Sequence, residues 1–180
     1  KNNENRYGSL WHYNTDEQDV TRLTDEMTNE HSPTFSPDGN YLYFTSERDF
    51  NLAFSSYEFD YMFNRATRIY AAAVNTDITP LVALQSDETT IVSDDDAQSD
   101  ADNGNQLQST GFMQRVTALN APSGDYRSLH GVDGGVLVMA NGALQLLGTE
   151  HDSELKTVAK GVSSYTVSCS VPSSCKAPYH

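Results

Sequence analysis

The chain has 180 residues, and 25 Asp and Glu against 11 Lys and Arg give it a net charge of −14. A single domain of this length buries roughly 70% of the surface that its unfolded chain exposes, so a packed core is expected. The negative charge repels nucleic-acid phosphates, and no apolar run approaches the roughly 18 residues of a membrane helix. We therefore expect a soluble protein with no nucleic-acid partner and no membrane insertion.

Two hairpins are predicted near the N-terminus. Residues 9–14 (SLWHYN) and 20–24 (VTRLT) read as short strands around a polar turn. Residues 32–36 (SPTFS) and 41–46 (YLYFTS) flank the turn 37–39 (PDG). In such a turn Pro fixes φ, Asp bonds its own backbone and Gly accepts a positive φ, so the second hairpin is tightly specified.

The middle of the chain combines two further predicted strands with an acidic segment. Residues 67–74 (TRIYAAAV) and 78–84 (ITPLVAL) are the strands. Residues 85–105 hold seven acidic residues and no basic one, which is typical of a solvated, flexible loop. The acidic residues do not fall in the register of a calcium-binding EF-hand loop, so no metal site is predicted there.

The second half of the chain reads as a series of short strands punctuated by Gly, Asn and Asp. The pair Asn141-Gly142 between two apolar runs is the clearest hairpin signal in the chain. The strands are predicted at residues 111–120, 126–132, 134–140, 142–148 and 155–161.

Strand groups return about every 40 residues, and no segment shows sustained helical periodicity, so the fold class is all-β. A four-stranded unit with that period predicts a partial β-propeller of about three to four antiparallel blades. The predicted parts are a partial blade (1–30), a blade with an aromatic insertion (31–84), the acidic loop (85–105), further blade strands (106–168) and an irregular tail (169–180).

Cys169 and Cys175 are the two cysteines of the chain. In an oxidising compartment they would close a small disulfide loop, and two unpaired thiols are the alternative. Neither this pair nor the scattered histidines have the spacing of a zinc site, so no metal or other cofactor is expected.

Three stretches carry a resemblance to a known family. Residues 32–50 (SPTFSPDGNYLYFTSERDF) resemble the PD40-type repeat of TolB-like, prolyl oligopeptidase and tricorn-type propellers. Residues 48–74 (RDFNLAFSSYEFDYMFNRATRIYAAAV) and 111–137 (GFMQRVTALNAPSGDYRSLHGVDGGVL) resemble the propeller of bacterial tricorn-like peptidases of the S41 class.

The resemblance implies a propeller that filters or guides peptides toward a serine peptidase domain, which in that family follows a PDZ-like domain. The catalytic Ser, His and Glu of the family have no counterpart in the aligned stretches, so the resemblance implies a non-catalytic portion that binds peptide or protein. It also implies a periplasmic or cell-envelope location.

The chain departs from the family pattern at its end and in its number of blades. Residues 168–180 (SCSVPSSCKAPYH) lack the expected Asp-Gly turn, and three to four blades are too few to close a propeller. Open blade edges favour pairing. We expect a homo-oligomer, and the alternative is that residues 165–168 complete the blade begun by residues 9–24.

Four residues are candidates for peptide binding. Positive charges are rare in this acidic chain, and an arginine can bind the carboxylate of a ligand. An aromatic side chain can line a peptide groove. The alternative is internal: the arginines pair with Asp49, Glu58 and Asp60, and the aromatic residues staple the insertion to the blades. The candidates are Arg48, Arg65, Arg68 and Tyr57.

A second function class is a small serine hydrolase with a Ser and His site inside the chain or between chains. The sequence has no Gly-x-Ser-x-Gly elbow. Ser128, His130 and Asp133 lie close together in sequence, which chance also explains. The sequence therefore leaves open whether the chain is an enzyme.

Overall fold

The computed structural model describes residues 4–48, 52–54, 61–63, 67–81, 106–150, 152–171 and 174–176. In these residues the fold is all-β apart from one short 3-10 helix, η1 (Phe112–Arg115), as predicted. No helix of the described part is both long and apolar enough to cross a bilayer. The acidic segment 85–105 lies outside the described residues.

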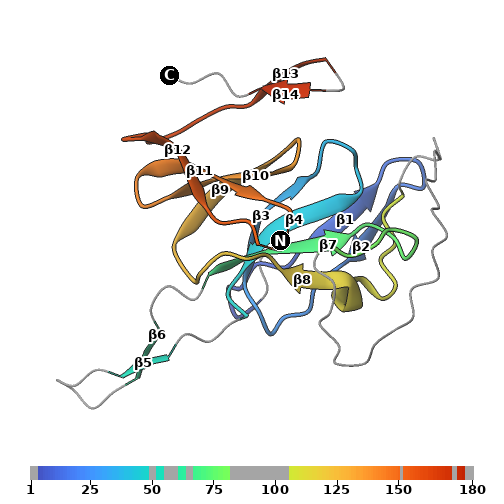
Figure 1. The fold of residues 1–180 in the computed structure, drawn as a ribbon. Helices are drawn as coiled ribbons and strands as arrows, with labels where there is room; N and C mark the ends of the chain where they lie inside the picture. The colour runs from blue at the N-terminus through green and yellow to red at the C-terminus, as the bar shows by residue number, and fades with distance from the viewer. Residues whose placement is uncertain are drawn as a thin grey trace, which may run out of the picture.

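Two four-stranded antiparallel sheets form the body of the molecule (Figure 1). The first blade has the order β3-β4-β7-β8, built from β3 (Glu30–Phe35), β4 (Tyr41–Ser46), β7 (Arg68–Ala73) and β8 (Val116–Ala118). The second blade runs β9-β10-β11-β12, built from β9 (Tyr126–Val132), β10 (Gly135–Ala140), β11 (Ala143–Gly148) and β12 (Lys156–Lys160).

Three two-stranded sheets complete the described structure. They are β1 (Trp11–Asn14) with β2 (Asp19–Arg22), β5 (Leu52–Phe54) with β6 (Tyr61–Phe63), and β13 (Ser168–Val171) with β14 (Ser174–Lys176). Backbone pairing in the last of these sets Cys169 opposite Cys175.

The inner strands of the two blades lie side by side. The Gly131 amide donates a hydrogen bond to Thr34 Oγ1 at 3.2 Å. A Cβ added at Gly131 would lie 2.2 Å from the Phe35 carbonyl oxygen, so only glycine allows this approach. Adjacent four-stranded meanders with neighbouring inner strands are the arrangement of a propeller, and the fold is a partial β-propeller.

Three apolar layers correspond to the faces of the blades. The first lies between the blades and includes Tyr43, Ile69 and Val136. The second covers the other face of the first blade, where Phe44 stacks on Tyr70 with ring centroids 5.9 Å apart. The third lies on the side of the second blade that faces away from the first. We call this side the far face.

The two tight turns agree with the sequence analysis. Gly39 has a φ of 73°, as the Pro-Asp-Gly turn requires. Asn141 and Gly142 have φ values of 53° and 70°, so this two-residue turn between β10 and β11 has the positive angles of a type I′ hairpin.

Two strand predictions differ from the structure. Residues 78–81 form no strand, and the Thr79 carbonyl instead accepts a hydrogen bond from the Tyr41 hydroxyl at 2.7 Å. The predicted strand 111–120 begins with η1, because Gly111 takes a left-handed φ of 68° and the Phe112 side chain is buried against the Phe44 ring.

Each blade has a β-bulge in its inner strand, and the sequence analysis predicted neither of the two bulges. In β3 the pairing with β4 shifts between His31 and Thr34, and Ser32 has a φ of 52°. In β9 the shift lies between Arg127 and His130, and Ser128 has a φ of 53°. The repeated serine at a left-handed angle shows that the two blades share one local design.

Candidate functional site

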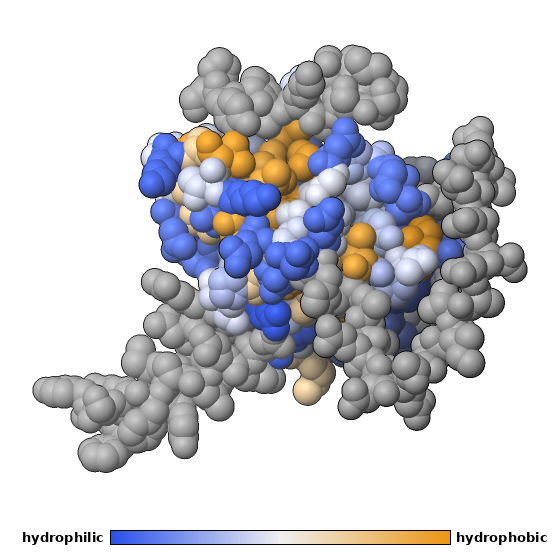
Figure 2. Space-filling model, in the orientation of Figure 1, coloured by the Kyte–Doolittle hydropathy of each residue, from blue (hydrophilic) through white to orange (hydrophobic). Residues whose placement is uncertain are grey.

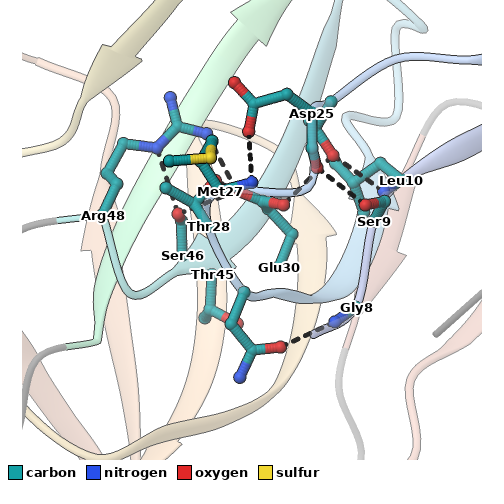
Figure 3. A network of polar contacts seen from close by, with 12 residues as sticks. Gly8, Ser9, Leu10, Asp25, Met27, Thr28, Glu30, Thr45, Ser46 and Arg48 are labelled. Atoms are coloured by element: carbon teal, nitrogen blue, oxygen red, sulfur yellow. Dashed lines mark hydrogen bonds and ion pairs between the residues drawn. The ribbon is translucent and has the colours of Figure 1, made fainter. Parts of the chain in front are cut away.

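A polar network lies at the end of the first blade where the β2–β3 and β4–β7 connections meet (Figure 3). It includes Arg48, one of the four predicted binding residues, and Glu30, the first residue of β3. The close-up shows both side chains pointing into the space between the two connections.

The Glu30 carboxylate is the centre of this network. Its side chain is fully buried, and it accepts hydrogen bonds from Thr24 Oγ1 at 3.0 Å, Ser46 Oγ at 3.1 Å and the Thr28 hydroxyl. The Arg48 guanidinium lies 3.2 Å away and supplies the opposite charge. Burying a carboxylate is costly unless it is paired and hydrogen-bonded, and Glu30 is both.

The Arg48 guanidinium is held in one orientation. Its Nε donates to Ser46 Oγ at 3.0 Å, and the group lies over the Tyr70 ring at 4.7 Å and the Phe44 ring at 5.5 Å. Only 18% of the side chain is exposed. The positive charge is thus anchored by a carboxylate and by two aromatic faces, a geometry that Lys would not reproduce.

The structure pairs Arg48 with an acidic residue that the sequence analysis did not name. The acidic residues considered there, Asp49, Glu58 and Asp60, lie outside the described residues. Glu30, eighteen positions before Arg48, takes the role. A lone Glu beside a strand looks solvated in a sequence, so no pattern identified it.

Backbone groups extend the network to the N-terminal segment. The Leu10 amide donates to Thr24 Oγ1 at 2.9 Å, and Thr24 in turn donates to Glu30. The Gly8 amide donates to Asn29 Oδ1 at 2.8 Å. The network therefore fastens the β1–β2 hairpin to the first blade.

Arg68 lies at the same end of the blade. It is the first residue of β7 and pairs in register with Ser46, the last residue of β4. Burial raises the pKa of the Tyr126 phenol, and the nearby charge of Arg68 partly offsets this effect. Arg48 and Arg68 therefore lie at the two ends of the β4–β7 connection. Tyr57 and Arg65, the other two predicted binding residues, lie outside the described residues.

A cavity of about 320 Å³ opens beside β9 and the β10–β11 turn, with Arg127, Ser128 and Asn141 among its lining residues. The Gly124 amide donates to the Thr67 carbonyl at 2.9 Å, which ties the β8–β9 connection to the start of β7. The cavity and the two arginines therefore lie at the same end of the propeller.

The sequence-adjacent Ser, His and Asp do not form a hydrogen-bonded set. Ser128 and His130 lie on β9, Ser128 in the bulge, and Asp133 lies in the β9–β10 turn. Within the described residues no hydrogen bond joins any two of them. In the same part of the chain, His, Cys, Asp and Glu side chains nowhere gather in groups of three or more that would hold a metal ion.

Comparison with known proteins yields a likeness of fold. No protein-family model matches the chain, and no curated protein sequence matches it. Among solved structures, the tricorn protease superposes with a TM-score of 0.67 over 89% of this chain at 14% sequence identity. The chain corresponds to 16% of the length of that protein.

Proposed function

We propose that this chain is a non-catalytic β-propeller portion of a tricorn-like peptidase, where it contacts peptides or proteins and guides substrate. The observation that carries the proposal is the structural similarity to the tricorn protease over 89% of the chain. The PD40-type and S41-type stretches of the sequence support the same proposal, which includes a periplasmic or cell-envelope location.

The surface proposed for contact is the end of the first blade that bears Arg48 and Arg68, together with Tyr57 and Arg65 in the connection between them. Glu30 and the aromatic rings hold the Arg48 guanidinium, so it loses little conformational freedom when a second acceptor arrives. A guanidinium has five N–H donors in a fork, and a peptide carboxylate is a suitable acceptor.

Fluorescence anisotropy tests this with two labelled decapeptides of one sequence, one with a free C-terminal carboxylate and one with a C-terminal amide. We expect tighter binding of the carboxylate form. Arg68→Gln and Arg65→Gln should each weaken it about tenfold, because a charge-assisted hydrogen bond contributes about 1.5–3 kcal/mol. Lys160→Gln on β12 is the matched control for the loss of one charge.

Equal affinity for the two peptides would show that the chain does not recognise the C-terminal carboxylate. Absence of binding at millimolar peptide would remove the peptide contact altogether. Cleavage of either peptide by the purified chain, abolished by a single Ser→Ala substitution, would overturn its non-catalytic character.

A further inference from the structure

A cavity of about 280 Å³ lies between the two blades, at the end of β4 that is farther from Arg48. The β3–β4 turn lines one side of it with Pro37 and Asp38, and the β9–β10 turn lines the other side with Asp133. Its other lining residues include Tyr41, Tyr43 and Leu81. Pockets for drug-sized ligands measure roughly 300–1,000 Å³, so this cavity suits one side chain or a small molecule.

The Tyr43 hydroxyl opens on this cavity without a partner. The Tyr43 side chain is 2% exposed, and within the described part of the chain no group forms a hydrogen bond with its hydroxyl. The hydroxyls of Tyr41, Tyr126 and Tyr165, by contrast, each donate to a backbone carbonyl. Buried polar groups in native proteins nearly always have a partner. The Tyr43 hydroxyl therefore calls for a partner inside the cavity.

The Tyr43 phenol and the Asp38 carboxylate act on the same space. Burial raises the pKa of the Tyr43 phenol, and Asp38 and Tyr41 raise it further. Asp38 also raises the pKa of Tyr41, after the larger effect of burial. The Tyr43 phenol therefore keeps its proton at neutral pH, and its oxygen can accept a hydrogen bond beside a negative charge.

Two carboxylates make the cavity negative. The Asp38 carboxylate accepts hydrogen bonds from the Asn40 amide at 3.1 Å, from Asn40 Nδ2 at 2.6 Å and from the Ser36 hydroxyl, which fix it without neutralising it. The exposed Asp133 carboxylate has neither a hydrogen bond nor an ion pair with any residue that the structure describes. The lining residues include no Lys, Arg or His. The cavity therefore holds two negative charges and no positive one.

The cavity beside β9 shows the usual alternative. Asp125 and Arg127 both line it, and Arg127 Nη2 donates to Asp125 Oδ2 at 2.6 Å. The chain itself supplies the cation there. At the cavity between the blades, the positive charge has to come from a ligand.

The surface of the molecule favours the approach of such a ligand. Hydrophilic side chains make up most of the coloured surface in Figure 2, and the net charge of −14 attracts cations to it. This diffuse attraction speeds association but selects no position. The selection comes from the cavity.

We propose that this cavity binds a primary ammonium group, as carried by a lysine side chain or a small alkylamine. An ammonium has three N–H donors, and the cavity offers three acceptor groups, namely Asp38, Asp133 and the Tyr43 hydroxyl. The Leu81 side chain gives the methylene stem an apolar contact. The proposal does not rest on the proposed peptide contact, because it concerns a ligand of opposite charge at the end of β4 away from Arg48.

Isothermal titration calorimetry of the purified chain with Nα-acetyl-lysine amide and with n-butylamine tests the proposal. We expect both amines to bind, and we expect no binding of Nα,Nε-diacetyl-lysine amide, which lacks the charge. Asp133→Asn should weaken the binding of both amines about tenfold, because it removes one of the two charges. Tyr43→Phe removes only the hydroxyl and should weaken it about fivefold.

Asp19→Asn on β2 is the matched control, because it removes one exposed negative charge outside the cavity. It should leave both affinities unchanged. Tighter binding of the lysine derivative would support the site with a peptide side chain as its ligand. Butylamine that binds as tightly or more tightly would support the site with a free amine as its ligand.

Absence of amine binding at millimolar concentration would overturn the proposal. Equal weakening by Asp19→Asn and Asp133→Asn would also overturn it, since only diffuse charge attraction would remain. A Tyr43→Phe variant that binds as well as the unmodified chain would overturn the role of the hydroxyl. Neither amine carries a carboxylate, so this proposal and the proposed peptide contact can fail separately.

Discussion

The two blades are built on one plan and differ in how their strands are connected. Both have the inner-strand bulge with a serine at positive φ. In the first blade the β4–β7 and β7–β8 connections span residues 47–67 and 74–115, whereas the second blade uses residues 141–142 and 149–155. The inner strands therefore define the blade, and the outer connections are free to vary.

The long connections of the first blade are each secured by an arginine. Arg48 pairs with Glu30 at the root of the first connection. Arg115 closes the second, where its guanidinium donates to the carbonyls of Ala73, Thr110 and Gln108. The two-residue turn of the second blade needs no such anchor, because its backbone angles alone fix the geometry.

The largest expected effect breaks the anchor of the first blade. Arg48→Met leaves the Glu30 carboxylate buried without its cation and should lower the free energy of unfolding by about 3–5 kcal/mol in urea titration. Adding Glu30→Gln should recover much of that loss. Arg127→Met, at an exposed pair with Asp125, should change little. Equal losses for Arg48→Met and Arg127→Met would contradict the anchoring role.

The next prediction compares the covered face of the first blade with the far face of the second. Ile69→Ala removes a fully buried side chain and should cost about 2–5 kcal/mol. Leu146→Ala, at a half-buried site, should cost less than about 2 kcal/mol. A cost as large as that of Ile69→Ala would show that the far face is packed as tightly as the contact between the two blades.

The shared bulge gives a smaller and symmetric effect. Ser32→Val and Ser128→Val place a β-branched residue at a left-handed angle and should each cost about 1–2 kcal/mol in thermal or urea unfolding. Ser→Gly at either position should be nearly neutral, because glycine adopts these angles freely. If the two valine substitutions lower the free energy of unfolding by markedly different amounts, the two bulges contribute differently to the stability of their blades.

The smallest expected effect concerns the segment on the far face. Burial raises the pKa of Tyr165 to about 12 from its ordinary 10.0. The unfolded chain therefore loses this proton first, and stability should fall as the pH rises from about 10 to about 12. Urea titrations across this range should show a shallower decline for Tyr165→Phe. An unchanged slope would mean that Tyr165 is ionised as easily in the folded chain.

The sequence predicted the parts of the fold that depend on local chemistry. Alternation and turn residues located both N-terminal strand pairs and the Asn141-Gly142 hairpin. The failures arose where tertiary contacts decided the conformation. Phe112 turns into η1 to reach the Phe44 ring, and no local pattern at residues 111–120 indicates that contact.

The candidate site was predictable only in part for the same reason. Arg48 and Arg68 attracted attention because basic residues are rare here, but their proximity depends on the β4–β7 pairing. Glu30 meets Arg48 only after the β2–β3 connection folds back on the end of β4. The sequence spacing of a Glu and an Arg carries no information about such a contact.

The register of β4 with β7 also makes the first blade a suitable host for grafting. Ser46 and Arg68 are direct partners, so the chain leaves and re-enters the sheet at neighbouring positions. The distance that a replacement segment must bridge is that of two adjacent strands, about 5 Å. Foreign loops of very different lengths fit that gap when they are inserted after Arg48, which the buried Glu30 carboxylate requires, so the chain offers a display scaffold.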